Sequence, residues 1–222
     1  MIDPRLLQLC DSAFPSGAFS HSFGLETAIL ERGVRDAAGV RAWLAAYLGD
    51  TLATLDARGM VLAMCGEDVV ALDAWIGASI FAVEARSANR RLARATLDAY
   101  ASMGLDDAPA RAYREAIGAD RAHGIHALAV ALGHRAIGAT PADAVCGYLS
   151  AAAAALAAVA ARAIPLGQRD VGAMLWGLRD PIRAYTERAM EVRGMDDLTA
   201  SAIACEIDAM RHADLDGRLF AS

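Results

Sequence analysis

Residues 14–29 read FPSGAFSHSFGLETAI and gather serines, a histidine and a glutamate that could serve as a nucleophile, a base or an acid. Ser22 in SHSFG is the candidate nucleophile, because a nucleophile elbow carries its serine as G-x-S-x-G on a strand-to-helix turn. Ser20 stands in place of the first glycine, and His21 is adjacent in sequence to both serines, a position from which side chains seldom meet. We therefore interpret the hydroxyls as caps of a helix that begins near Leu25. A serine hydrolase that uses Ser22 stays the alternative.

Two histidines have a spacing that could bind a metal. His123 and His126 are three residues apart, so on one helix they would share a face, and Asp120 could add an oxygen. Without a convincing third ligand, the pattern is more typical of a hydrogen-bonded core or interface histidine. A stand-alone helical nickel-binding protein is the alternative. His134 and His212 are isolated in sequence, and we interpret both as surface or helix-end residues.

Basic residues recur every four positions at Arg86, Arg90 and Arg94, which places them along one side of a helix. Such a stripe is typical of a solvated helix face, with a docking stripe for an acidic partner as the alternative. The sequence contains no GxxxxGK[ST], GxGxxG or HExxH pattern, so we expect no nucleotide bound by a standard loop.

Composition points to helices that would position these residues. The chain is 56% hydrophobic but only 6% aromatic, with alanine, the strongest helix former, supplying much of the total. A formal charge of −6 disfavours nucleic acid or an anionic membrane as the main partner. The uncharged run 144–161 is short and alanine-rich for a membrane span, so we expect a buried core helix.

The cysteines and the first ten residues indicate the cellular compartment of the protein. Cys10, Cys65, Cys146 and Cys205 form no CxxC pair and have apolar neighbours, so we expect small buried side chains and a reduced environment. The opening MIDPRLLQLC does not have the pattern of a secretory signal peptide. We expect a cytoplasmic protein.

Apolar residues repeat at helical spacing along nearly the whole chain, and no segment shows sustained alternation. The sequence predicts one all-α domain over residues 1–222, a bundle of roughly ten helices including short ones. Asp3, Asp36 and Thr140 are expected N-caps. The expected helices include 57–65, 69–81, 82–103, 110–132, 141–164, 168–178, 182–190 and 198–212.

Several segments resemble the urease accessory protein UreF family. LLQLCDSAFPSGAFSHSFGLETAI (6–29) is similar to the family's opening pattern, and HGIHALAVALG (123–133) is followed by a small-residue helix and IPLGQRDVGAMLWGL (164–178). EIDAMRHADLDGRLFAS (206–222) resembles the family's C-terminus, although Ala221 stands where family members commonly have an arginine. These segments lie in the family's order and span almost the entire chain.

The resemblance implies an all-helical adaptor rather than an enzyme. UreF proteins form homodimers and bind a UreD-type (UreH) protein; this pair recruits the GTPase UreG for GTP-dependent nickel insertion into apo-urease. Nickel and GTP would therefore be handled by the complex, and no cofactor is expected to bind this chain directly.

The resemblance also implies two partner-binding segments, an N-terminal segment and loop (1–24) and a C-terminal tail (213–222). Pro15 and Gly17 would shape the loop, with a purely architectural role for Pro15, Gly17 and Gly24 as the alternative. The expected GTPase-side residues are Phe19, Ser20, His21, Ser22, Gly24, Glu26 and Gln168. The expected UreD-side residues are Arg218, Leu219 and Phe220, unless the tail packs back on its own chain.

Overall fold

The computed structural model describes residues 3–221, apart from the side chain of Phe19, and every regular element in that range is a helix. This confirms the all-α prediction. The first half contains α1 (Pro4–Leu9), η1 (Ala18–Ser20), α2 (Leu25–Glu31), α3 (Ala37–Tyr47), η2 (Leu48–Asp56), α4 (Ala57–Met64), α5 (Val69–Ala78) and α6 (Val83–Ser102). The second half contains α7 (Ala108–Gly118), α8 (His126–Ala136), α9 (Pro141–Ala163), α10 (Gln168–Ala189), η3 (Met195–Asp197), α11 (Ile203–Arg211) and η4 (His212–Asp214).

Side-chain caps fix where several helices begin. Asp3, Asp36 and Thr140 accept hydrogen bonds from backbone N–H groups in the first turns of α1, α3 and α9, as predicted. Asp68 and Asp107 do the same for α5 and α7. Each cap satisfies a donor that an α-helix leaves unpaired at its N-terminus, which is worth about 1 kcal/mol.

The helix predicted over 110–132 is wrong, because the chain leaves α7 and begins α8 only after a loop. Asp120 and Gly124 have φ values of +54° and +89° in that loop, outside the helical region. The buried carboxylate of Asp73 accepts hydrogen bonds from the backbone N–H groups of His123, Gly124 and Ile125. A carboxylate contributed by α5 therefore holds open a break that local helix propensity would close.

Two further helix boundaries differ from the predictions. The segments 168–178 and 182–190 form one helix, α10, which continues through Pro181 and packs along α9 and α3. The helix predicted from residue 198 begins only at Ile203, because Thr199 N–H donates to Thr54 O and Ser201 N–H donates to Asp50 O. Tertiary packing overrides local signals in both places.

A continuous helical segment joins α3, the π-helical η2 and α4, where the sequence predicted a separate helix from residue 57. The helix is not interrupted at either junction, because every residue at the boundaries between the three elements has right-handed helical φ and ψ angles. Gly49 lies within η2 without breaking it.

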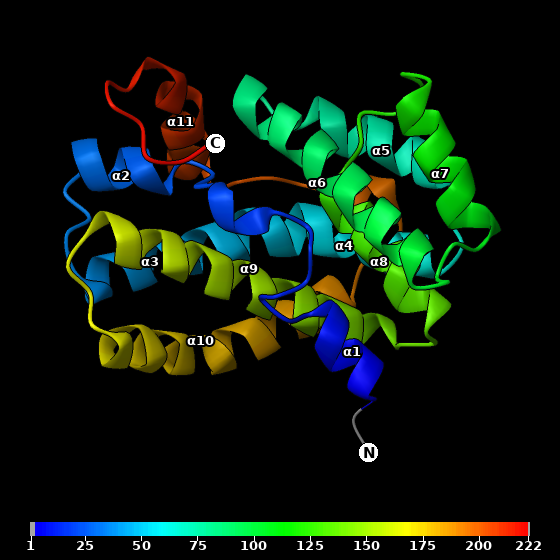
Figure 1. Ribbon diagram of the computed structural model, residues 1–222, viewed down its shortest axis with the longest axis horizontal. Helices are drawn as coiled ribbons and strands as arrows, with labels where there is room; N and C mark the ends of the chain where they lie inside the picture. The colour runs from blue at the N-terminus through cyan, green and yellow to red at the C-terminus, as the bar shows by residue number, and fades with distance from the viewer. Residues whose placement is uncertain (1–2, 222) are drawn as a thin grey trace.

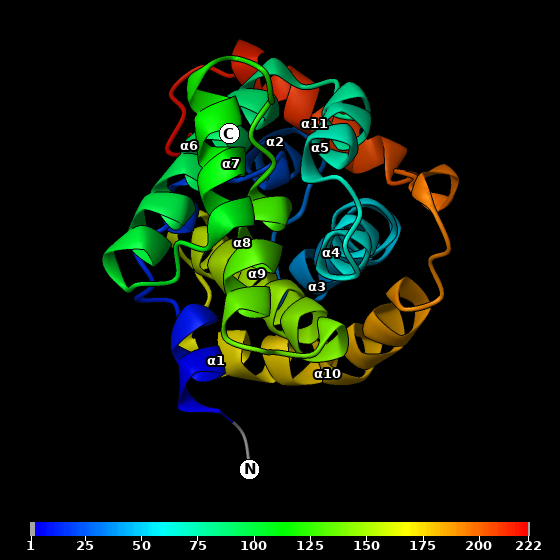
Figure 2. The same ribbon diagram turned by 90° about the vertical axis from the view of Figure 1, so that its right-hand side faces the viewer.

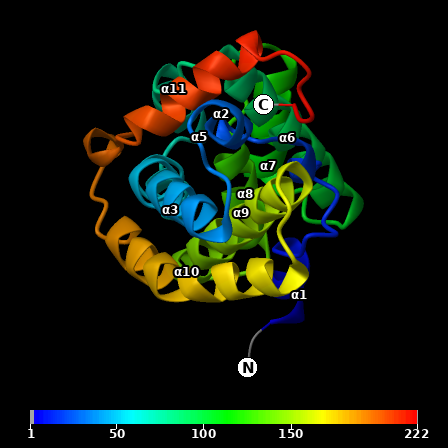
Figure 3. The same ribbon diagram turned by 90° about the vertical axis from the view of Figure 1, so that its left-hand side faces the viewer.

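Helix α9 runs through the middle of the bundle, with α11 on one side and α10 on the opposite side (Figures 1, 2 and 3). It packs against α10, α4 and α8. By length and composition α9 could cross a membrane, and it is the one such helix in the described residues, yet half of its most apolar window is buried inside the bundle. This agrees with the predicted core helix.

The prediction of four buried cysteines is wrong for two of them. Cys205 is buried and Cys10 is partly buried, whereas Cys65 and Cys146 are exposed. Cys65 follows the last turn of α4, and Cys146 lies on the outer face of α9, so apolar neighbours in sequence did not imply burial.

Candidate functional site

The loop from α1 to α2 is shaped by two glycines in left-handed conformation. Gly17 has a φ of +80° and open space where a Cβ would be, so the turn itself requires glycine. Gly24 has a φ of +93°, and a Cβ there would lie 2.6 Å from Ala209 N and 2.9 Å from Cys205 O. Gly24 therefore also permits the close approach of α2 to α11.

The C-terminal tail lies along this loop. Ser22 N–H donates to Ala221 O (3.0 Å), and Ala221 N–H donates to Ser20 O (2.8 Å), which forms a short parallel bridge. His21 and Ser22 are buried and Ser20 is exposed. The predicted role of Phe19 falls on a side chain outside the described part of the structure.

Beneath the bridge, four charged or titratable side chains form a group that we call the Glu26 cluster: Glu26, Glu84, His212 and Arg218. The Glu26 carboxylate is 1% exposed and accepts hydrogen bonds from the backbone N–H groups of Leu219 (2.7 Å) and Phe220 (3.2 Å). His212 Nε2 lies 3.0 Å from Glu26 Oε2, and His212 Nδ1 lies 2.7 Å from Glu84 Oε2. The Arg218 guanidinium donates to the other oxygen of Glu84 (2.7 Å).

The Glu26 cluster explains how a buried carboxylate is tolerated and what it does. Buried charges are retained when partners satisfy them, and here the partners are His212 and two backbone N–H groups of the tail. Phe220 is buried, and the Arg162 guanidinium lies 4.6 Å from its ring centre. Leu219 is 68% exposed. The cluster therefore holds the tail against its own chain. This agrees with the alternative expectation for residues 213–222, that the tail packs back on the same molecule.

The sequence did not reveal two members of the cluster. His212, expected at the surface or at a helix end, is the C-cap residue of α11 and is fully buried. The fold brings the carboxylates of Glu26 on α2 and Glu84 on α6 to its two ring nitrogens. Glu84 has no distinctive motif around it. His212 lies inside the C-terminal segment that resembles the family ending, and this resemblance is the sequence feature that could have indicated its role.

Gln168 is the one expected GTPase-side residue outside residues 19–26. It is the exposed first residue of α10, and no hydrogen bond or ion pair joins it to the loop within residues 3–221. Helix α10 runs on the side of the molecule opposite α11 (Figure 3). The structure thus brings together the loop and the tail, whereas the predicted role of Gln168 beside them stays a prediction.

The candidate metal pair does not share a helix face. His123 lies in the loop before α8, where its ring packs against Gly77, whereas His126 is the first residue of α8. Burial lowers the pKa of His126 to about 4, with a further contribution from nearby His21. Among the described residues, no group of three histidine, cysteine or acidic side chains is placed to hold a metal ion.

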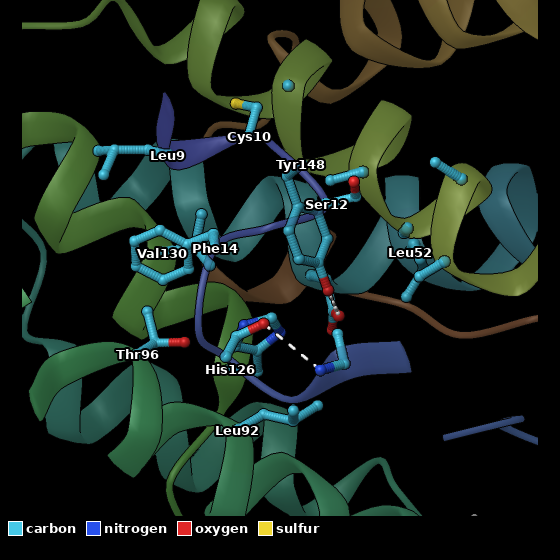
Figure 4. Close-up of a pocket in the computed structure, with 18 of the residues that line it drawn as sticks. Leu9, Cys10, Ser12, Phe14, Leu52, Leu92, Thr96, His126, Val130 and Tyr148 are labelled. Atoms are coloured by element: carbon cyan, nitrogen blue, oxygen red, sulfur yellow. Dashed lines mark hydrogen bonds between the residues drawn. The ribbon is translucent and has the colours of Figure 1, made fainter. Parts of the chain in front are cut away.

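A cavity of about 120 Å³ lies under the loop, between α6, α8 and α9 (Figure 4). Its walls are mainly apolar, with Phe14 from the loop and Leu92 from α6 on opposite sides. Asp56 and Tyr148 also line it, joined by a 2.6 Å hydrogen bond, and burial raises the pKa of Asp56 to about 6. The loop therefore covers a mainly apolar cavity that contains one polar pair, Asp56 and Tyr148.

Neither Ser22, the candidate nucleophile, nor the partly buried Cys10–His134 pair has the properties of a hydrolase site. Ser22 Oγ is buried and has no hydrogen-bond partner among the described atoms. The prediction that a serine hydroxyl caps α2 is therefore wrong, because Gly24 is the N-cap residue and Ser20 Oγ donates to Gly17 O. Cys10 Sγ does lie 3.4 Å from His134 Nε2, but burial raises the pKa of the Cys10 thiol to about 11 and lowers the pKa of His134. Both shifts oppose formation of the thiolate that acts as a nucleophile. His134 itself is buried in the last turn of α8, so the predicted helix-end position is confirmed and the surface position is wrong.

The arginine stripe is partly structural. Arg86 donates to the carbonyl oxygens of Ile80 and Phe81, and Arg90 donates to those of Ile117 and Ala122. These two guanidiniums therefore stabilise the loop before α6 and the loop after α7. Of the three arginines in the predicted stripe, only Arg94 is exposed.

Comparisons with known proteins agree with one another. The family model UreF matches residues 34–179. The chain is 36% identical to the urease accessory protein UreF of Arthrobacter sp. (strain FB24), with 98% of this chain and 96% of the relative covered. It is 33% identical to UreF of Paenarthrobacter aurescens (strain TC1) and 35% identical to UreF of Bacillus sp. (strain TB-90), over 98% of this chain and 96% and 97% of those relatives.

Proposed function

The chain belongs to the UreF family of urease accessory proteins, and from this we propose that it is a non-catalytic adaptor in urease maturation. Together with a UreD-type protein it would recruit the GTPase UreG for GTP-dependent nickel insertion into apo-urease. Nickel would be cargo of the assembly, and GTP would be bound by UreG. We further propose that the adaptor works as a cytoplasmic homodimer.

One observation carries most weight: the Glu26 cluster joins the loop and the tail into a single surface. Glu26, in the first turn of α2 directly after the loop, is one of the residues expected to contact the GTPase. Its carboxylate holds Leu219 and Phe220 of the tail, which is expected to contact the UreD-type protein. A change in the tail's position on binding one partner would therefore alter the loop offered to the other. This coupling suits an adaptor that assembles two proteins in order.

Exposure divides the residues of this surface into two roles. Leu219 and Ser20 are exposed and available to touch a partner, whereas Glu26, His21 and Ser22 are buried and would act by holding the surface in shape. Burial of the exposed Leu219 side chain by a partner would remove apolar surface from water, which favours association. Nothing in this arrangement needs a metal or a nucleotide.

The two alternative functions have less support. A stand-alone nickel carrier based on His123 and His126 would need ligands that the fold places on different elements. A serine hydrolase would need a base at Ser22 Oγ, which is buried without a hydrogen-bond partner in the described chain. Nickel titration of the isolated protein and labelling with a fluorophosphonate probe test these alternatives.

The proposal is tested by co-purifying the chain with the UreD-type and UreG proteins of the same genome, followed by size-exclusion chromatography with light scattering. We expect a complex of all three proteins, which is lost when residues 218–222 are deleted or Phe19 is changed to alanine. Trp75→Ala, an exposed aromatic residue on α5 outside both partner-binding segments, is the matched control and should assemble normally. Failure of the intact chain to form any complex, with or without nucleotide and nickel, would reject the proposal.

A further inference from the structure

The cavity under the loop contains buried polar atoms that the fold leaves without partners. Thr96 lines the cavity, and its Oγ1 atom is buried without a hydrogen bond in the described chain (Figure 4). Asp56 is 7% exposed. The Tyr148 hydroxyl donates to Asp56 Oδ2, whereas Oδ1 makes no hydrogen bond within residues 3–221. Because folding normally pairs the polar groups that it buries, the two unpaired atoms point to a ligand.

The charge of Asp56 restricts what that ligand can be. Burial raises the pKa of Asp56 to about 6, although the hydrogen bond from Tyr148 opposes this shift, so the carboxyl group is ionised at neutral pH. Burial lowers the pKa of His126 to about 4, so this imidazole is neutral there. No arginine is among the described residues that line the cavity, and the chain contains no lysine. The carboxylate therefore makes no ion pair within the described chain, and a positively charged ligand would supply one.

The walls of the cavity suit an apolar body that carries this charge. Five aromatic residues line it: Phe14, Phe23, Tyr47, Tyr100 and Tyr148. The ring centres of Phe14 and Tyr100 are 5.3 Å apart, and those of Phe23 and Tyr47 are 6.3 Å apart, so these rings hold one another in place. Aromatic rings attract organic ammonium groups, and the Tyr148 hydroxyl already reaches the Asp56 carboxylate.

Water and metal ions fit the cavity less well than an organic cation. A mainly apolar wall offers water few of the roughly two to four hydrogen-bond partners that it needs. A metal ion would need several ligands, and no group of three metal-binding side chains occurs among the described residues. The cavity volume of about 120 Å³ is slightly smaller than the ~150 Å³ that accommodates a benzene ring, so the ligand has roughly six non-hydrogen atoms or fewer.

We propose that this cavity binds a small organic ammonium ion, which pairs with Asp56 Oδ1 and packs its apolar body among the aromatic rings. Thr96 Oγ1 offers a second hydrogen bond from the wall. Folding has already removed water from the carboxylate, so an entering cation loses only its own hydration. The site is largely formed before the ligand arrives, which favours affinity.

The ligand would touch the loop between α1 and α2 from the inside, because Phe14, Ala18 and His21 are among the residues that line the cavity. A bound cation would therefore stabilise the conformation of this loop. The inference goes beyond the adaptor proposal, and only one consequence depends on that proposal: the stabilised loop is the segment proposed to contact the GTPase.

The test measures binding of n-butylammonium to the full-length chain by titration calorimetry at neutral pH, where an alkyl amine is protonated. The uncharged ligand of the same size, 1-butanol, should bind at least tenfold more weakly. Asp56→Asn keeps the shape of the side chain and should weaken binding of the cation about tenfold or more, because a hydrogen bond to a charged group is lost. Asp50→Asn, an exposed aspartate in the same helical segment η2, is the matched control and should bind the cation as tightly as the unmodified chain.

Hydrogen–deuterium exchange locates the bound cation. Saturating n-butylammonium should slow exchange at residues 11–18 of the unmodified chain and leave Asp56→Asn unaffected. Thr96→Val removes only the unpartnered hydroxyl and should bind the cation about threefold or more weakly. This second variant keeps the test decisive if far-UV circular dichroism shows that Asp56→Asn does not fold.

Three outcomes would overturn the inference. Equal affinity for n-butylammonium and 1-butanol would show an apolar cavity that does not select a charge. Unchanged affinity in Asp56→Asn would place the cation elsewhere, and no binding to the unmodified chain would mean that the cavity takes no such ligand. Each of these results leaves the co-purification experiment untouched, so failure of this inference is distinguishable from failure of the adaptor proposal.

Discussion

Replacing Glu26 with glutamine tests whether this carboxylate fastens the C-terminal tail. The substitution keeps the size of the side chain but replaces one acceptor oxygen with an NH₂ group. Leu219 N–H donates to one carboxylate oxygen, and Phe220 N–H donates to the other, so one backbone donor must lose its acceptor in either amide orientation. The charge that faces His212 is lost as well.

The magnitude follows from these contacts. A hydrogen bond to a charged group contributes about 1.5–3 kcal/mol, and an unsatisfied buried donor has a cost of the same order. Because Glu26 is 1% exposed, water cannot easily replace the lost acceptor. We expect tail docking to weaken by roughly 2–3 kcal/mol, so that the local opening equilibrium rises on the order of 30- to 150-fold.

Hydrogen–deuterium exchange measures this opening directly. In Glu26→Gln the amides of Leu219, Phe220 and Ala221 should exchange faster by that factor, while amides in the centre of α9 keep their protection. Glu187→Gln, an exposed glutamate on α10, is the matched control and should leave tail exchange unchanged. Unchanged exchange at residues 219–221 in Glu26→Gln would refute the role assigned to the carboxylate.

Three further outcomes are expected. Gly24→Ala should lower the midpoint of urea unfolding, because its Cβ would meet backbone atoms of α11 in a left-handed conformation; an unchanged midpoint would contradict this packing. Burial raises the pKa of Asp56 from 3.8 to about 6, so the free energy of unfolding falls as Asp56 ionises between pH 4 and 6. Burial lowers the pKa of His126 from 6.5 to about 4, so His126 raises the free energy of unfolding over a similar pH range. Asp56→Asn should therefore make the unfolding free energy rise with pH between 4.5 and 7, by about 2 kcal/mol more than in the unmodified chain, and parallel pH profiles would contradict the assignment. Finally, Cys65 and Cys146 should react with a thiol reagent before the other two cysteines, as mass spectrometry of the labelled peptides would show.

The sequence predicted those features that depend on neighbouring residues. Asp36 and Thr140 cap their helices because a short polar side chain reaches the first turn that follows it. The central position of α9 followed from its length and alanine content. In each case the local pattern and the tertiary structure favour the same conformation.

The features that could not be predicted depend on side chains distant in sequence. Asp73 interrupts the helix expected over 110–132 by binding backbone N–H groups about fifty residues away, as the hydrogen bonds to His123 and Gly124 show. In the candidate site, the loop glycines and the tail were recognisable from motifs. The burial of Glu26 and its link to the tail were not, because they arise only when α2, α6 and α11 pack together.

The central claim, that this chain is required for urease maturation as an adaptor, is tested most directly by measuring nickel incorporated into purified apo-urease. The reaction would contain the UreD-type protein, UreG, GTP and Ni²⁺, with and without this chain, and nickel in the re-isolated urease would be measured by mass spectrometry. The account predicts GTP-dependent incorporation only when the chain is present. Equal incorporation when the chain is omitted would contradict it.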